Sequence, residues 1–404
     1  MLYYLGLESG VIDGQPVSSS DWEMIVQQSI RYNVASLLYH RLKPLSPGVD
    51  FIPSSVMQKL RMNYHQCALK NMRLYQELSD LARMLHNDGV PVVVLKGAHL
   101  AKIVYGNIAL RRMCDLDILV KKDDLSITVK RLLKMGYHPT RPFKIEDELV
   151  RHHHLRPFIK EGAAPVEIHW NIQTQGSHFT VDVDGLWKRA RPVIINNVQM
   201  LVLSPEDLIL HLCLHATQHI LKIGLRPCCD LSEIIRHYGD DLDWKQLRLR
   251  SRQWGADRSL YLMLYLLKEL VGQESPEDLL KLDLLDQFDT RFAAGCKAHI
   301  IMKINGGGTA LTPDLAKFWE TERLKDKAIL FLKRIFISRD YLARFYHVQP
   351  DSALIYFYYL MRLKYLLLRY GSTIWRLLLH DRETVNSTEQ ENSQVALKEW
   401  LRFP

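Results

Sequence analysis

The sequence lacks an apolar segment long enough to cross a membrane. The most apolar C-terminal run, Ser352 to Met361, has ten residues before Arg362, whereas a membrane-spanning helix needs about 20. The first residues also show no basic lead followed by an apolar stretch and a cleavage site, so we expect no signal peptide. These absences predict a protein located in the cytoplasm.

Cysteine is sparse, and its spacing does not suit a zinc site. The six cysteines include one adjacent pair, Cys228-Cys229, which we interpret as part of a buried helix start in a reducing compartment rather than as a disulfide. The glycine run from Asn305 to Gly308 is not followed by Gly-Lys-Ser/Thr, which excludes a P-loop there. The sequence also lacks internal repeats and any recognisable RNA-binding motif.

The composition that is present is typical of a globular protein. The chain is 47% hydrophobic and 24% charged. Its length of 404 residues is sufficient for two or three packed units. The formal net charge of +8 is concentrated in residues 323–382, which hold twelve Lys or Arg against four Asp. This basic region indicates either an anionic partner, such as a phosphorylated substrate, nucleic acid or membrane surface, or a solvated helical surface.

Two acids stand inside an otherwise apolar run from Cys114 to Val120. In a strand Asp115 and Asp117 point to one face, and Leu116 points to the other. Two carboxylates at about 4 Å repel by about 4 kcal/mol at an effective dielectric constant near 20. A divalent cation such as Mg²⁺ would relieve this repulsion. The alternative is a pair of solvated acids on an edge strand.

A third acid lies in a second predicted strand, Pro165 to Trp170. Alternation places Glu167 and His169 on one face of that strand. If the two strands are neighbours, Asp115, Asp117 and Glu167 form a metal cluster that binds a metal–triphosphate and activates a hydroxyl for in-line attack. We predict that His169 contacts substrate or relays a proton; a hydrogen-bonded structural role is the alternative.

Basic residues precede these acids. Lys96-Gly97 follows a β-branched run, and a glycine between strand and helix lets backbone amides approach a phosphate. Lys96 would then offset triphosphate charge. Arg111 or Arg112 is expected to pair with the phosphates or to brace Asp115.

Histidines occur in two further groups. In His152-His153-His154, alternation allows at most His153, or the other two, to face the site. His211, His215 and His219 share one helix stripe, but its ends are about 11–12 Å apart, too far for one metal ion. We therefore expect the stripe to line the cleft, where His215 or His219 contacts the nucleotide.

Local signals predict several elements in detail. Asp123 is expected to cap a helix that ends at Met135, and Asp230 to cap a helix from Leu231 to His237. Asn196-Asn197 predicts the turn of a hairpin between residues 193 and 202. Ser204 and the acids that follow it predict the start of a helix.

The ordered set of motifs resembles the bacterial uncharacterised nucleotidyltransferase family, part of the polymerase-β-like nucleotidyltransferase superfamily. The residues that carry the resemblance are Leu95-Lys96-Gly97, Tyr105, Arg111, Asp115 to Val120, Gly136-Tyr137, Glu167 to Trp170, Leu203 to Asp207, His211 to His215, His219 and Asp230. The chain departs from the family pattern in having Glu167 where Asp is more frequent and Arg112 where Pro is common. A Gly-Ser pair before the acids is also missing, and Lys96-Gly97 takes its place.

The resemblance implies a metal-dependent nucleotidyltransferase. It would use Mg²⁺ or Mn²⁺ and ATP or another NTP, and move a nucleoside monophosphate to a hydroxyl acceptor with release of pyrophosphate. Asp115, Asp117 and Glu167 would be the catalytic and metal-binding residues, and Glu167 would help to deprotonate the acceptor. Lys96, Gly97, Arg111, His169, His215 and His219 would bind the nucleotide. The acceptor is expected to be a saccharide or another small molecule.

The expected fold is α+β, with a small mixed β-sheet nucleotidyltransferase core between an N-terminal helical layer and a C-terminal all-helical domain. The expected boundaries are residues 1–89 for the N-terminal helices, 90–203 for the core, 204–382 for the helical domain and 383–404 for a mobile tail.

Two other functions stay open. The chain could be a nucleotide-binding or regulatory protein without turnover. Alternatively, its basic C-terminal region could make it an RNA-modifying nucleotidyltransferase, although no RNA-binding motif supports this.

Overall fold

The computed structural model describes residues 18–44, 52–174, 177–218 and 224–273, together with short pieces between residues 296 and 364. The predictions for His219, for the glycine run after Asn305 and for most of the basic C-terminal region lie outside the described residues. Internal contacts divide the chain into two compact units, residues 1–293 and residues 294–403. The expected boundaries after residues 89, 203 and 382 stay predictions.

Three helices precede the first strand of unit 1: α1 (Ser19–Arg31), α2 (Ala35–Leu42) and α3 (Ser54–Asn87). Ser18 caps α1, and its hydroxyl accepts a hydrogen bond from the Asp21 amide. Apolar residues at helical spacing give α3 a buried stripe. The stripe includes Leu60, Leu74, Leu78, Leu81 and Leu85.

Seven short strands form one mixed sheet in the order β3-β4-β5-β2-β1-β7-β6. Their bounds are β1 Val93–Val94, β2 Leu116–Leu119, β3 His138–Pro139, β4 Phe158–Ile159, β5 Val166–His169, β6 Arg191–Ile195 and β7 Val198–Val202. β2 pairs in parallel with β5, and β1 pairs in parallel with β7, while the other pairs are antiparallel. This sheet confirms the expected α+β fold with a mixed sheet.

The hairpin of β6 and β7 turns at Asn196 and Asn197, as the sequence predicts. Both residues have positive φ values, 46° and 61°, the left-handed backbone that a type I′ turn needs and that asparagine tolerates better than most residues.

Short helical segments join the strands. α4 (Lys96–His99) continues into a π-helical turn at Leu100–Val104, and α5 (Leu125–Lys134), α6 (Ile145–Arg151) and α7 (Val183–Arg189) follow. The prediction that Asp123 caps α5 is wrong, because a 3₁₀ turn at Lys122–Asp124 comes first and Asp124 takes the cap position without a side-chain hydrogen bond.

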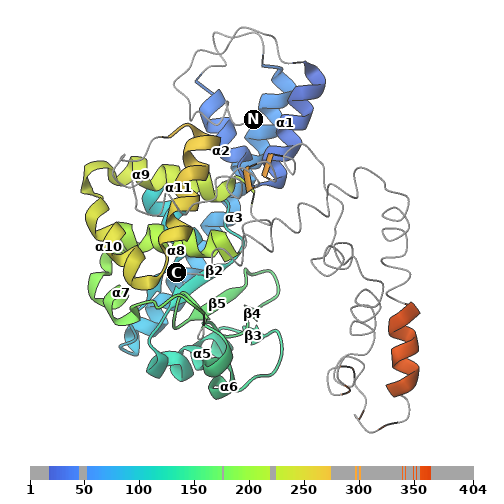
Figure 1. Ribbon diagram of the computed structural model, residues 1–404, viewed down its shortest axis with the longest axis vertical. Coiled ribbons are helices and arrows are strands. Elements are labelled where there is room, and N and C mark those ends of the chain that lie inside the picture. The colour runs from blue at the N-terminus through green and yellow to red at the C-terminus, as the bar shows by residue number, and fades with distance from the viewer. Residues whose placement is uncertain are drawn as a thin grey trace, which may run out of the picture. The chain divides into compact units, whose positions relative to one another are not determined.

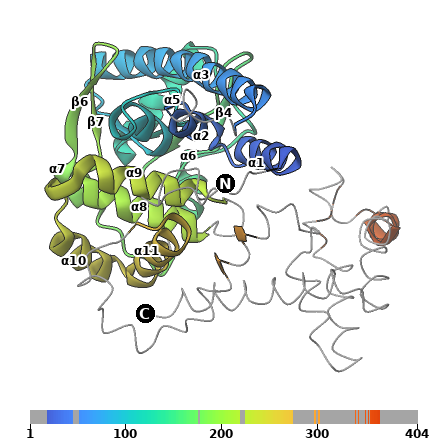
Figure 2. The same cartoon turned by 90° about the horizontal axis from the view of Figure 1, so that it is seen from above.

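Four longer helices complete the described part of unit 1: α8 (Pro205–Gln218), α9 (Arg226–Tyr238), α10 (Trp244–Trp254) and α11 (Asp257–Val271). The Ser204 hydroxyl accepts a hydrogen bond from the Asp207 amide at the start of α8, as expected. Figures 1 and 2 show α3 on one side of the strands and α8 to α11 on the other. Among the described residues, no helix combines the length and apolar character needed to cross a membrane.

Candidate active site

The site is built on the parallel pair of β2 and β5. Their register places Asp117 opposite Glu167 and Leu119 opposite His169. Side chains of paired residues lie on the same face of a sheet, so the two carboxylates are neighbours. The alternating residues Leu116 and Ile118 are buried on the other face, in the hydrophobic core. Strand alternation therefore directs apolar side chains to the core and acids to a cavity.

Asp117 is held by two donors at one oxygen. Lys96 Nζ and His169 Nε2 each lie 2.9 Å from Asp117 Oδ1. Burial would raise the pKa of Asp117, but the charges and hydrogen bonds of Lys96 and His169 outweigh burial and hold the pKa well below its usual value. Asp117 is therefore an ionised carboxylate with a fixed orientation.

The second oxygen of Asp117 has no hydrogen bond within the described part of the chain. Asp117 belongs to a group that could hold a metal ion, in which ligand atoms of Asp117, Glu167 and His169 all lie within 4.8 Å of one another. Ligands on opposite sides of Mg²⁺ are about 4.2 Å apart, so small side-chain adjustments would close the group around an ion. Two carboxylates and one imidazole suit a divalent cation, and the donor set therefore fits.

Asp115 lines the same cavity but does not belong to that group. It directly precedes β2 and is only partly buried. Burial raises its pKa, and the nearby charges of Asp117 and Glu167 add to the rise. The structure thus brings the three predicted acids to one cavity, with His169 rather than Asp115 completing the tightest cluster.

Lys96 reaches Asp117 from the end of β1. Its backbone has a φ of 39°, a left-handed conformation that is uncommon for a residue with a side chain. This conformation turns the chain sharply from the strand into α4. Gly97, expected to expose amides to a phosphate, also has a packing role, because a Cβ there would lie 2.8 Å from Arg111 Nη1.

Arg111 is engaged by a residue of α9. Its Nε and Nη2 donate to the two carboxylate oxygens of Asp230 at 3.1 and 3.0 Å, and Tyr105 Oη donates to the same carboxylate. Both members of the ion pair are buried. The charge of Arg111 is therefore largely neutralised by Asp230 and is less available to a phosphate than the sequence suggested.

Asp230 does not cap a helix, so that prediction is wrong. α9 begins four residues earlier, at Arg226, because Pro227 occupies the first turn, where a missing amide hydrogen is tolerated. Asp230 instead projects from the interior of α9 towards Arg111 and Tyr105.

Two arginines were not assigned a firm role from the sequence, yet both line the cavity. They are Arg112 and Arg226, and neither has a hydrogen bond or ion pair within the described residues. Burial lowers the pKa of Arg226, and the neighbouring charge of Arg111 lowers it further. An arginine beside a proline at a helix start is the only sequence signal that could have suggested Arg226.

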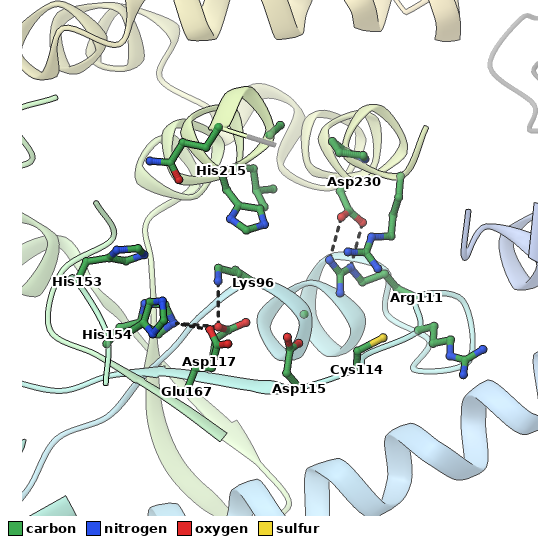
Figure 3. Close-up of a pocket in the computed structure, with 18 residues that line it drawn as sticks. Lys96, Arg111, Cys114, Asp115, Asp117, His153, His154, Glu167, His215 and Asp230 are labelled. Atoms are coloured by element: carbon green, nitrogen blue, oxygen red, sulfur yellow. Dashed lines mark hydrogen bonds and ion pairs between the residues drawn. The ribbon is translucent and has the colours of Figure 1, made fainter. Parts of the chain in front are cut away.

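The cavity has a volume of about 300 Å³. Figure 3 shows the acids and Lys96 at its base and His215 and Asp230 reaching towards them from helices on the opposite side. Four cations and four carboxylates line the cavity. They are Lys96, Arg111, Arg112 and Arg226, with Asp115, Asp117, Glu167 and Asp230.

Both His153 and His154 line the cavity, whereas His152 is exposed beside Glu148. The expectation that neighbours in this triplet face opposite ways is wrong, because the segment forms only an isolated bridge between His154 and His169 and no regular strand. His154 Nδ1 donates to the Leu155 carbonyl at 2.7 Å. Burial lowers the pKa of both, that of His153 to about 2, so these rings are neutral at pH 7.

On α8, His215 lines the cavity, as predicted, while His211 is buried and does not line it. Burial holds the pKa of His211 well below its usual value. His219 lies outside the described residues, so only one member of the predicted stripe is seen at the site.

Comparison with known proteins gives one family and two distant structures. Residues 18–272 match the family model described as "Uncharacterised nucleotidyltransferase". The chain is similar to the solution structure of antibiotic-resistance factor ANT(2'')-Ia, with 9% identity, coverage of 45% of this chain and 93% of that chain, and a TM-score of 0.34. It is also similar to an antigenic nucleotidyltransferase-like protein from Paracoccidioides brasiliensis, with 14% identity, coverage of 46% and 89%, and a TM-score of 0.28. No curated protein matches the chain.

Proposed function

The chain belongs to the uncharacterised nucleotidyltransferase family, whose model matches residues 18–272, and on that premise we propose that it transfers a nucleoside monophosphate from an NTP to a hydroxyl of a small acceptor. The observation that carries the proposal is the cluster of Asp117, Glu167 and His169 within 4.8 Å, beside Lys96 in a cavity. Lys96 offsets only one of the two neighbouring carboxylates, so a bound cation would relieve the repulsion that remains between Asp117 and Glu167.

Asp117, Glu167 and His169 are the residues that would hold the cation. Mg²⁺ or Mn²⁺ bound there would supply polarisation of phosphate oxygens and neutralise part of the triphosphate charge. Lys96 fixes the Asp117 carboxylate before substrate arrives, and binding of the cation would replace the hydrogen bond between His169 Nε2 and Asp117. This preorganisation reduces the rearrangement needed during the reaction.

An arginine without a carboxylate partner would receive the phosphate tail. Lys96 and Arg111 already pair with Asp117 and Asp230, whereas Arg226 at the start of α9 lines the cavity and has no such partner within the described residues. Guanidinium groups bind phosphate oxygens through paired hydrogen bonds. The β- and γ-phosphates would therefore lie towards Arg226, and the α-phosphate towards the acids.

In the reaction the acceptor oxygen would attack the α-phosphorus. The bond from that phosphorus to the bridging oxygen breaks, and pyrophosphate leaves. Glu167, whose side chain is 23% exposed against 3% for Asp117, would take the proton of the acceptor hydroxyl. Positioning and charge stabilisation would supply most of the rate gain.

The test is transfer of label from α-³²P NTPs. The purified chain would be incubated with each of the four NTPs, Mg²⁺ or Mn²⁺, and either a small-molecule cell extract or total cellular RNA, and labelled products identified by mass analysis. Asp117→Asn should lower the rate by about 10²–10³-fold, because it removes a charge that acts on the transition state. The exposed Asp80→Asn on α3 is the control, and thermal unfolding verifies the fold of both variants.

The outcomes separate the candidate functions. Equal transfer by wild type and Asp117→Asn would overturn the proposed site. Tight binding of Mg–NTP without any labelled product would favour a nucleotide-binding protein without turnover. Label on RNA, with binding that weakens steeply as salt increases, would favour the RNA-modifying alternative.

A further inference from the structure

A second cavity is lined mainly by residues of the N-terminal helices. It has a volume of about 200 Å³ and lies between the α1–α2 corner, α3 and the loop before β2. The polar side chains at this cavity form a chemically distinct set.

The lining of the second cavity combines hydrogen-bonding groups with positive charge. Asn33, Asn63 and Gln66 supply amides, Ser36 supplies a hydroxyl, and Lys70 and Arg112 supply cations. No acidic side chain belongs to the described lining, and neither cation has a hydrogen bond or ion pair with another described residue. Two cations at one small cavity without a counter-charge favour an anionic ligand.

Arg112 lines both cavities, and its backbone is anchored. The buried Asn71 of α3 donates to the carbonyl oxygens of Ile108 and Arg111 at 2.5 and 2.8 Å and accepts from the Met113 amide at 3.1 Å. The residues on both sides of Arg112 are therefore fixed to α3. Arg112 forms a shared wall between the two cavities rather than part of a loose loop.

Arg112, which lines both cavities, lies close to Asp115 in the chain. Asp115 follows Arg112 by three residues, and three residues of fully extended chain span at most about 11 Å. A ligand anchored by its anionic group between Lys70 and Arg112 could extend a hydroxyl towards Asp115 over a distance comparable to the length of a phosphorylated sugar.

We propose that the second cavity binds the acceptor, a small polyhydroxylated molecule that carries a phosphate or carboxylate group. The anionic group lies between Lys70 and Arg112, and the amides of Asn63 and Gln66 bind hydroxyl groups. This inference rests on the proposed function, since it names the substrate class for the same transfer.

The test is calorimetric titration of the full chain with glucose 1-phosphate, glucuronate and neutral glucose, alongside a separate titration with Mg–ATP. At least one anionic sugar should bind at least tenfold more tightly than glucose, and the preferred one identifies the anionic group. Lys70→Met should weaken anion binding about tenfold and leave Mg–ATP affinity within twofold. Arg83→Met is the matched control on α3, because Arg83 is exposed and pairs only with Asp80 among the described residues.

The two titrations distinguish the two proposals. If wild type binds Mg–ATP but binds the anionic sugars no better than glucose, the acceptor site is wrong and the proposed function stands. Equal anion affinity in Lys70→Met and Arg83→Met would likewise overturn the acceptor site. If the wild type fails to bind Mg–ATP, the titration is repeated with the other three Mg–NTPs, and binding of none of them overturns the proposed function itself.

Discussion

Gly97 shows at the residue scale how the site depends on a missing side chain. A Cβ at this position would lie 2.8 Å from Arg111 Nη1 and 3.3 Å from Met113 Cγ. The absence of a side chain therefore lets the buried guanidinium pass over the first turn of α4 and reach Asp230. The close packing of Arg111 therefore explains the glycine at position 97 without reference to any ligand.

Gly97→Ala should lower the free energy of unfolding by about 1–3 kcal/mol, because the new methyl group must displace Arg111 or shift α4. Urea unfolding measures this loss. In an Arg111→Met background the same alanine should cost clearly less, since the guanidinium is gone. An equal cost in both backgrounds would show that Arg111 is not the group that excludes a side chain.

Predictions for single residues were correct where the direction of a side chain depends only on its own strand. The alternation of a single strand suffices to place Asp117 opposite the core-facing Leu116, and to place Glu167 beside His169 in the second strand. The partner of Arg111 could not be found in this way, because Asp230 is 119 positions away in the sequence. From the sequence alone, a cap at the start of a helix is a sufficient role for Asp230. In the structure α9 starts earlier, at Arg226.

At the scale of elements, strong local signals also specified the hairpin at Asn196-Asn197 and the start of α8 at Ser204. The His152–His154 segment could not be predicted, because it lacks regular strand geometry and one bridge to β5 determines its orientation. The seven strands have two to five residues each, too few for periodicity to set their order in the sheet. That order depends on tertiary contacts.

The packing of α4 against α9 gives a pH prediction. His99 of α4 is fully buried, with its Nε2 3.4 Å from Tyr238 Oη of α9. Burial lowers the pKa of His99 to about 3, against about 6.5 in an unfolded chain. Between these values the unfolded state binds a proton that the folded state does not, so stability falls as the pH falls below 6.5.

His99→Gln should therefore lose less stability than the wild type between pH 7 and pH 5. The difference expected from this one group is about 2 kcal/mol at pH 5. Thermal or urea unfolding at both pH values measures it. The exposed His86→Gln on α3 should retain the acid sensitivity of the wild type, and equal losses in all three proteins would contradict the assignment to His99.

At the largest scale, ion pairs that are wholly or partly buried join α8 and α9 to other elements of unit 1. Arg111 pairs with Asp230 of α9, and Arg189 of α7 and Arg250 of α10 both contact Asp207 at the start of α8. Pairs of this kind are costly to break singly, because one charge is left buried without its partner.

A double-mutant cycle should show this coupling. Asp230→Asn and Arg111→Met should each lower the free energy of unfolding by about 3 kcal/mol, and the double variant should lose much less than the sum. Urea unfolding of the four proteins provides the values. Additive losses would mean that the two side chains stabilise the molecule independently.

The position of β1 has a consequence during synthesis. β1 lies between β2 and β7. In a nascent chain that has emerged only as far as β5, the edge of β1 that pairs with β7 is therefore unpaired. Unpaired strand edges invite association with other chains. The edge of β1 therefore stays vulnerable until Val202 has left the ribosome, and chains terminated before that point should be substrates for chaperones or proteases.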